Sequence, residues 1–274
     1  MTAFKPRIKK ILEKTVGSSL IKKIHFRFER NVHFFKNNRY KKRNPDLAIP
    51  SDEWLFETFQ LDYQKYFEDG DLAAKEILNW TTDLLPKEMP TILDWGCGTG
   101  RVIQNLHHHH PYLLLYGADI NADMINWNHQ NIKGVHFSHI TINPPTKYPK
   151  NYFDLIYGLS VLTHLPGNLQ NDWVREMNRI SKPSGIFLVT TMGNYYSNEL
   201  LNEEKNQLQS TGIFEKIFLA KTKVTVGDRN FSVYETPEYF ERIIADYFNI
   251  IQYFEGRKYP EKFGGQDLWI LQKK

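Results

Sequence analysis

The sequence has few of the features that mark secreted or membrane-spanning proteins. Cys97 is its only cysteine, so no intrachain disulfide can form, which is typical of a reducing compartment. No apolar stretch approaches the roughly 20 residues that a bilayer-crossing helix needs. Charged residues interrupt the N-terminal segment where a signal peptide needs its apolar centre; they are Glu13, Lys14, Lys22 and Lys23. These absences predict a cytoplasmic protein.

The spacing of cysteine and histidine that typifies metal sites is also missing. One histidine cluster, His107 to His110, stands at the end of a predicted helix, before Pro111. A metal site needs convergent ligands that neighbouring groups hold in place, and nothing elsewhere in the sequence completes such a set. We therefore expect a solvated helix end and no metal.

The charge of the chain is distributed unevenly. The 274 residues, 41% of them hydrophobic, suffice for one large domain or a domain with an appendage. Residues 1–43 hold 14 Lys and Arg but two acids, whereas the remainder holds 21 bases and 29 acids. We therefore divide the chain into a basic N-terminal extension at 1–48 and a mildly acidic main domain at 49–274.

The extension has the pattern of a basic amphipathic helix. Its apolar residues recur every three or four positions and so share one face; they are Ile21, Ile24, Phe28, Val32 and Phe35. Three interpretations stay open. The face packs on the domain or on a partner subunit, the helix of residues 1–43 lies on an anionic membrane surface, or it binds nucleic acid. The second would place the protein at the inner membrane face. The third is disfavoured, because no basic–aromatic pattern of a known RNA or DNA module occurs.

The most informative stretch is a buried strand that leads into a glycine-rich turn. Ile92 and Leu93 follow Pro90 and predict the strand. The turn reads Asp94-Trp95-Gly96-Cys97-Gly98-Thr99-Gly100-Arg101. The apolar spacing after it predicts a helix, and such a unit brings backbone N–H groups and a helix N-terminus close to a ligand.

The spacing of the glycines separates two classes of cofactor. The dinucleotide fingerprint Gly-x-Gly-x-x-Gly would place its third glycine at position 101, where this chain has Arg101. An acid in the turn would also repel a pyrophosphate at short range. Asp94 suits instead a ligand with a cationic ammonium group.

With its order of acid-x-Gly-x-Gly-x-Gly, the segment from Asp94 to Gly100 resembles the first motif of the class I S-adenosylmethionine-dependent methyltransferases. The resemblance implies S-adenosyl-L-methionine as cofactor and an α/β, Rossmann-like fold. Its doubly wound sheet would have seven strands, mostly parallel, with the last strand antiparallel, and the extension would add N-terminal helices. We expect a cofactor core at 88–192, a substrate lid at 193–235 and a closure of the sheet at 236–274.

Predicted strands and helices alternate along the main domain, which favours a parallel sheet with right-handed crossovers. The strands are expected at 112–120, 134–140, 153–162, 186–190, 248–254 and 268–271. The second strand ends in Asp119, where nucleotide-binding α/β folds place a carboxylate that binds the ribose hydroxyls. Ile120 would form one side of the adenine pocket. In the family an acid or amide after the third strand often pairs with adenine, and Asn143 matches. The complete predicted cofactor set is Asp94, Gly96, Cys97, Gly98, Gly100, Arg101, Asp119, Ile120, Asn143 and Leu159.

The triplet Asn143-Pro144-Pro145 also resembles the catalytic motif of amino-group methyltransferases that act on DNA bases or glutamine. In those proteins the motif follows the fourth strand and ends in an aromatic residue. Here it follows the third strand and precedes Thr146, which disfavours this function.

The fourth strand delivers His164 to the carboxyl end of the sheet, where open α/β sheets bind their ligands. An unperturbed histidine pKa lies near working pH, so His164 is the predicted general base. Its place is similar to that of a histidine in many small-molecule and sugar methyltransferases. A structural histidine that orients the loop is the alternative.

Two further segments bear on the acceptor. Aromatic and apolar residues before the first strand are expected to cover one side of the cofactor pocket; they are Leu55, Phe56, Phe59, Tyr63 and Tyr66. The segment 237–273 resembles the C-terminal part of bacterial methyltransferases associated with surface-polysaccharide and glycolipid assembly.

We therefore predict O-methylation of a small-molecule or glycan acceptor, such as a membrane-associated precursor. The alternatives are a methyltransferase acting on protein or RNA, and a non-catalytic cofactor-binding subunit whose basic arm binds a membrane or nucleic acid.

Overall fold

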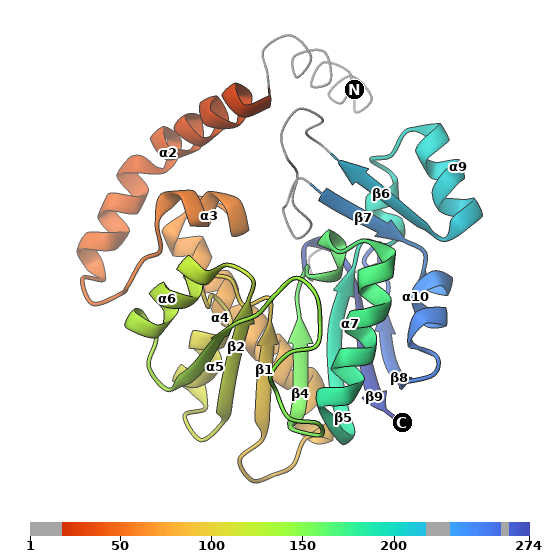
Figure 1. The fold of residues 1–274 in the computed structure, drawn as a ribbon. Helices are drawn as coiled ribbons and strands as arrows, with labels where there is room; N and C mark the ends of the chain where they lie inside the picture. Colours follow the sequence, from red (N-terminus) through yellow and green to blue (C-terminus); the bar gives the residue numbers. More distant parts are fainter. Residues whose placement is uncertain (1–17, 218–230, 259–262) are drawn as a thin grey trace.

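The computed structural model describes residues 18–217, 231–258 and 263–274, and its centre is a 7-stranded sheet in the order β3-β2-β1-β4-β5-β9-β8. The strands are β1 (Thr91–Trp95), β2 (Leu114–Asp119), β3 (Val135–His139), β4 (Phe153–Gly158), β5 (Ser181–Thr191), β8 (Phe248–Phe254) and β9 (Asp267–Lys273). Neighbours from β3 to β5 are parallel, and β9 runs antiparallel to both β5 and β8. This arrangement confirms the predicted fold class (Figure 1).

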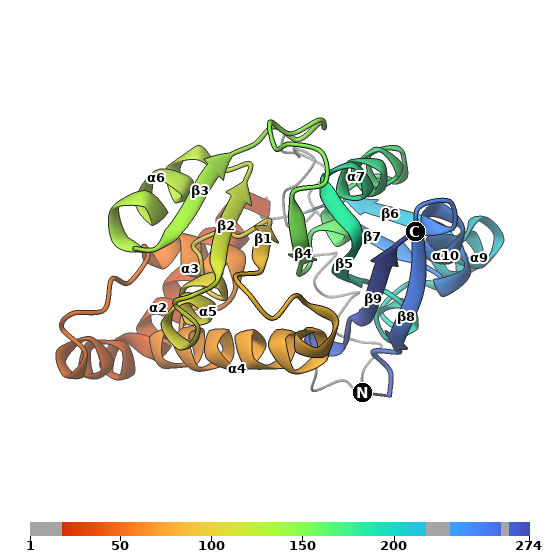
Figure 2. The ribbon, with the colours of Figure 1, turned by 90° about the horizontal axis from the view of Figure 1, so that it is seen from below.

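Alternating side chains of the central strands fill two hydrophobic layers. Leu93 and Trp95 of β1 pack in one layer, while Ile92 packs in the other. The first layer is covered by α7 (Gly167–Ile180) and α10 (Pro237–Ile244). The second is covered by α4 (Tyr63–Thr81), α5 (Ile103–His109) and α6 (Ala122–Asn131). Figure 2 shows α4 running along its face of the sheet. Because both faces are covered, β1 and β4 are buried throughout, as expected for central parallel strands.

One strand ends earlier than its apolar run predicts. The run continues to Leu162, but β4 stops at Gly158, and the chain turns into a 3-10 helix, η2 (Leu162–His164). Ser160 at the turn has a φ of 60°, in the left-handed region that non-glycine residues rarely occupy. The apolar run extends past the end of the strand because Leu162, although outside β4, is fully buried.

The segment between β5 and α10, expected to be polar and irregular with one short helix, is more ordered than predicted. It forms α8 (Asn194–Ser197), α9 (Asn202–Thr211) and a two-stranded antiparallel pair, β6 (Ile213–Ile217) with β7 (Phe231–Glu235). The pair lies over the end of the sheet at which the parallel strands finish (Figure 1).

In the described part of the chain, three α-helices and a 3-10 helix, η1 (Thr82–Leu84), precede β1. The extension forms α2 (Ser18–Arg43), and α3 (Asp52–Thr58) begins where the Ser51 hydroxyl accepts a hydrogen bond from the Trp54 N–H. Asp62 caps α4 in the same manner by accepting from the Lys65 N–H. Among the described residues, no helix combines the length and the apolar character that crossing a membrane would require. The part of the predicted extension before Ser18 lies outside the described residues.

Candidate cofactor and acceptor site

A cavity of about 440 Å³ opens at the carboxyl ends of β1, β2 and β4. This volume is typical of small-molecule sites, and the position is where open α/β sheets bind ligands. Most of the predicted site residues line it: Asp94, Gly96, Cys97, Gly98, Arg101, Asp119, Ile120, Leu159 and His164. Residues far apart in the sequence therefore meet here because parallel strands end at one edge.

The glycine turn is shaped by three positive φ angles. Gly96, Gly98 and Gly100 have φ values of 77°, 51° and 72°. A Cβ on Gly96 would lie 2.5 Å from Cγ2 of Val161, whereas one on Gly98 would meet nothing nearer than Thr58 Cγ2, at 3.8 Å. Gly96 thus permits close packing under the turn, and Gly98 keeps the backbone open to the cavity.

Two acids, the buried Asp94 and the half-buried Asp119, give the cavity its electrostatic character. Asp94 is 5% exposed, and its register partner on β4 is Tyr157. Burial raises the pKa of Asp94 to about 7; the charge of Asp119 adds to the rise, while Tyr157 and Arg101 oppose it. A cationic ligand beside Asp94 would therefore stabilise its ionised form.

Asp119 is positioned by the backbone of the turn it faces. Its Oδ2 accepts a hydrogen bond from the Gly98 N–H at 2.7 Å, and its Oδ1 accepts one from the Asn121 N–H at 2.8 Å. Burial raises the pKa of Asp119, and these N–H groups counter the rise. Since each carboxylate oxygen has two lone pairs, Asp119 retains capacity for two hydroxyl donors.

Arg101 connects the cavity to the aromatic residues that precede β1. Its guanidinium lies 4.4 Å from the centroid of the Phe59 ring, a cation–π contact. Tyr66 contacts the glycine turn through a hydrogen bond, with its hydroxyl 2.8 Å from Thr99 Oγ1. Burial lowers the pKa of Arg101, against the attraction of Tyr66 and of acids including Asp94.

His164 reaches the cavity from η2. Its Nδ1 lies 2.7 Å from the carbonyl oxygen of Phe231, the first residue of β7. A carbonyl can only accept, so Nδ1 is the donor, and in the neutral ring Nε2 carries the lone pair. The strand pair over the sheet thereby fixes the orientation of the imidazole.

Two predicted cofactor residues lie outside this cavity. A Cβ on Gly100 would point at Ile132, at the end of α6, 2.5 Å from its Cδ1. Asn143 is exposed and lines a separate hollow beside α7. Its role in cofactor binding stays a prediction.

The loop after β3 is held against α7, which explains the position of Asn143. The Trp173 indole N–H donates to the Ile142 carbonyl at 2.9 Å, and the Thr146 N–H donates to Glu176 at 2.8 Å. Ile142, and not the amide that follows it, therefore lines the cavity.

Sequence reasoning missed one wall of the cavity. Trp54, Glu57 and Thr58 of α3 line it. Leu55 and Phe56 were predicted to do so, but Leu55 is buried in a separate cluster and Phe56 is buried against Phe26 of α2. The apolar face of α3 packs on the helices, so its more polar face meets the ligand space. An amphipathic reading of α3 alone could have identified the two faces but not their partners.

The histidine run does not converge on a metal site. His109 pairs with Asp71 of α4, and His107 packs on Gly134. Across residues 18–217, 231–258 and 263–274, no group of three or more His, Cys, Asp or Glu side chains is arranged to hold a metal ion.

The donor set of the cavity fits S-adenosylmethionine. The desolvated Asp94 would meet the ammonium group, and Asp119 the ribose hydroxyls. Ile120, Ile140 and Ile142 provide an apolar surface for a base. The open backbone at Gly98 leaves room beside both acids.

Comparison with known proteins finds similarity to methyltransferases. Residues 93–189 match the family model described as a methyltransferase domain. A phosphoethanolamine N-methyltransferase from Plasmodium falciparum is 26% identical over 160 residues, which span 57% of this chain and 55% of that protein. The chain spans about half the length of the curated relatives it matches.

Solved structures share the fold at low identity. An S-adenosylmethionine-dependent methyltransferase from Mesorhizobium loti has a TM-score of 0.54 and 16% identity, covering 75% of this chain and 100% of that one. CalS10, an amino pentose methyltransferase from Micromonospora echinaspora, has a TM-score of 0.51 and 15% identity, covering 76% and 92%. At these identities the likeness shows the fold.

Proposed function

We propose that this chain, which carries a methyltransferase domain of the class I S-adenosylmethionine-dependent type, methylates a hydroxyl group of a sugar or another small hydroxylated acceptor. Membrane-associated glycolipid and polysaccharide precursors fall within this class. The observation that carries the proposal is the fixed imidazole of His164, bonded at 2.7 Å to Phe231, in the cavity that also contains Asp94 and Asp119.

The residues of the cavity divide the work between holding the cofactor and activating the acceptor. Asp94 would hold the ammonium group and Asp119 the ribose. When bound, S-adenosylmethionine supplies a methyl group on a sulfonium centre that is already activated for transfer. The protein is then required mainly to align the acceptor and exclude water.

A base at His164 favours an alcohol acceptor. A hydroxyl must lose its proton as the new bond forms, and Nε2 of a neutral His164 can accept that proton. The bond to Phe231 keeps Nδ1 protonated and stabilises the imidazolium that results. A neutral amine already has a lone pair and needs no such base before it attacks.

Sequence similarity favours a second candidate, N-methylation of a small polar amine. The observation behind it is the 26% identity to a phosphoethanolamine N-methyltransferase. The two candidates differ in the bond formed, a methyl ether or a methylated amine, which mass spectrometry of the product distinguishes.

The test is methyl incorporation by the full chain. The purified protein is incubated with S-adenosylmethionine labelled in its methyl group and an extract of the source cells. The extract is then separated into lipid, carbohydrate, RNA and protein fractions. We expect label in the lipid or carbohydrate fraction. Label confined to protein or RNA would overturn the acceptor class, and cofactor binding by calorimetry without incorporation would identify a non-catalytic subunit.

A further inference from the structure

Helix α2 is attached to the body of the protein through one face. The Phe26 ring lies 5.4 Å from Phe56 of α3, and Tyr40 stacks on Phe67 of α4 at 6.0 Å. Between them Asn37 is buried; its amide donates to the Leu61 carbonyl at 3.1 Å and accepts from the Tyr63 N–H at 3.0 Å. These contacts give the helix a defined orientation.

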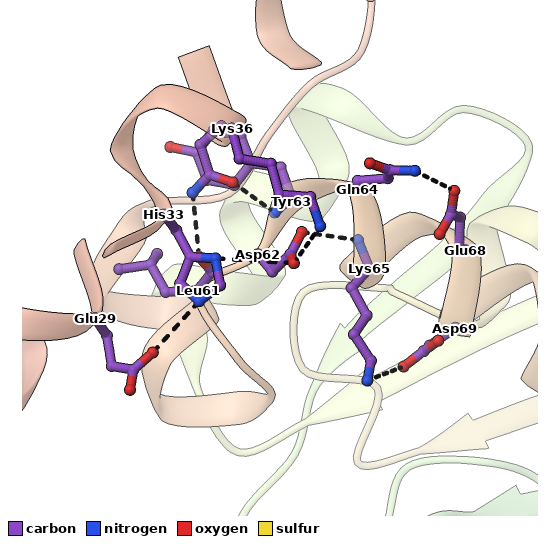
Figure 3. Close-up of polar contacts among 11 residues, drawn as sticks. Glu29, His33, Lys36, Leu61, Asp62, Tyr63, Gln64, Lys65, Glu68 and Asp69 are labelled. Carbon is purple, nitrogen blue, oxygen red and sulfur yellow. Dashed lines mark hydrogen bonds and ion pairs between the residues drawn. The ribbon is translucent and has the colours of Figure 1, made fainter. Parts of the chain in front are cut away.

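An ion pair strengthens this junction. Lys36 lies 2.6 Å from Asp62, the residue that caps α4, and His33 lies 3.8 Å from the same carboxylate (Figure 3). The Lys36 hydrogen bond helps lower the pKa of Asp62 against the effect of burial. The two helices are therefore linked through a polar cluster as well as through aromatic contacts.

The opposite face of α2 is an exposed apolar stripe. It consists of Leu20, Ile24, Phe28, Val32 and Phe35, which are 50%, 55%, 61%, 57% and 81% exposed. At roughly 100° per residue, the centre of this stripe lies about half a turn from the face that contains Asn37. Soluble proteins rarely leave a contiguous row of large apolar side chains in water, so the stripe marks a binding surface.

The charges on α2 identify what that surface fits. From Lys23 to Arg43 the helix has eight Lys and Arg and a single acid, Glu29, which faces His25 and His33. Arg27 borders one side of the stripe and Arg43 the other, while Arg39 continues the line of the stripe beyond Phe35. Cations flanking an apolar stripe are the pattern of a helix that lies in the plane of a membrane interface.

We infer that α2 binds the surface of a bilayer containing anionic phospholipids. The stripe enters the boundary between headgroups and acyl chains, and the flanking bases bind lipid phosphates. Nucleic acid would satisfy the bases but leave five large apolar side chains against a charged backbone. Two copies of α2 packed face to face would bring two strongly basic helices together.

Docking through α2 would also place the candidate site near the membrane. Phe56 and Trp54 lie on opposite sides of α3: the first contacts α2, and the second lines the cavity. One helix, roughly 10 Å across, thus separates the membrane-binding helix from the site. This step rests on the proposed function and favours an acceptor attached to a lipid, whereas the docking itself requires no catalysis.

Vesicle flotation of the full chain tests the inference. Neutral vesicles contain phosphatidylcholine, and anionic vesicles contain equal parts of phosphatidylcholine and phosphatidylglycerol. The apolar stripe is changed by Phe28→Ser with Phe35→Ser, and the matched control is Leu72→Ser with Met89→Ser, two exposed apolar residues elsewhere. Arg27→Gln with Arg39→Gln tests the charges, and Lys87→Gln with Lys133→Gln is their control.

We expect the wild type and both controls to float with anionic vesicles and not with neutral ones. Both α2 variants should lose about tenfold or more of that binding, while S-adenosylmethionine affinity by calorimetry stays unchanged and shows that they fold. Absence of vesicle binding by the wild type would overturn the inference, as would undiminished binding by the stripe variant. RNA binding or dimerisation that the stripe variant loses, without vesicle binding, would assign the surface to that partner.

Discussion

At the scale of single residues, the charge state of Asp94 depends on what occupies the cavity. Without a cationic partner its pKa is raised to about 7, mainly by burial. A protonated Asp94 cannot attract an ammonium group. Affinity for S-adenosylmethionine should therefore rise with pH up to about 7 and level off above it, weakening by roughly tenfold per pH unit well below.

Calorimetric titrations between about pH 5.5 and 8 measure this dependence. Asp94→Asn should weaken binding and remove most of the pH dependence. Asp83→Asn, at an exposed position before β1, should leave both as in the wild type. A wild-type affinity that is flat over this range would contradict the assignment of the ammonium site to Asp94.

The two interpretations of His164 can be separated by a substitution that keeps its hydrogen bond. The amide of Asn can donate to the Phe231 carbonyl as Nδ1 does, but it has no basic nitrogen. We expect His164→Asn and His164→Ala to lower methyl incorporation by about 10²–10⁴-fold, with cofactor affinity unchanged. Retention of near-wild-type turnover by His164→Asn would assign the residue to structure.

At the scale of elements, β7 carries a buried acid that couples stability to pH. Glu235 is 1% exposed and lies 3.2 Å from Gln170 of α7. Burial raises its pKa to about 8, so the folded state binds the proton more tightly than the unfolded state does. The resulting stabilisation is complete below the ordinary glutamate pKa and is lost as the pH rises through about 8.

Glu235→Gln should reduce this loss because glutamine cannot ionise. Between pH 5 and 8 the free energy of unfolding of the wild type should fall, relative to the variant, by up to about 1.4 kcal/mol per pH unit. Chemical denaturation at several pH values measures the difference, with Glu203→Gln at an exposed site of α9 as control. Parallel profiles for the wild type and Glu235→Gln would show that Glu235 is ionised in the folded protein.

Elements with strong local signals were predictable from the sequence. β8 has the predicted bounds, 248–254, and the glycine turn follows β1 and lines the cavity. The pairing of β6 with β7 could not be predicted from the sequence. The two five-residue strands are separated by 13 residues, and this distance leaves no local turn signal.

The parts of the site that the sequence did not reveal depend on tertiary packing. Which side of α3 faces the cavity is decided by α2, through the contact of Phe26 with Phe56. The position of Asn143 is decided by Trp173 and Glu176, which lie about 30 residues further along the chain. Neither relation has a signature in a short window of sequence.

At the scale of the whole molecule, the chain combines a mildly acidic α/β domain with a basic N-terminal arm. The sheet order confirms the predicted fold class, and residues 93–189 match the family model described as a methyltransferase domain. The excess of 12 positive charges in residues 1–43 is balanced against an excess of eight negative charges in the rest. Membrane affinity and cofactor binding should therefore be separable properties of different surfaces.

Binding at the cavity should stabilise the entire fold, since its lining joins β1, β2, η2 and α3. S-adenosylhomocysteine, the demethylated cofactor, at about 100 times its Kd should add about 2.7 kcal/mol, which corresponds to a rise in Tm of about 5–10 °C. Asp119→Ala removes the acceptor of the Gly98 N–H together with the proposed ligand of the ribose, so most of this rise should disappear.

Asp123→Ala is the matched control, because this acid is exposed in the first turn of α6 and does not line the cavity. Its Tm without ligand would be slightly lower, but its rise with ligand should equal that of the wild type. Scanning calorimetry with and without ligand measures both quantities. A full rise in Asp119→Ala would remove Asp119 from the cofactor site, because a ligand can stabilise a fold only through contacts that the folded state provides.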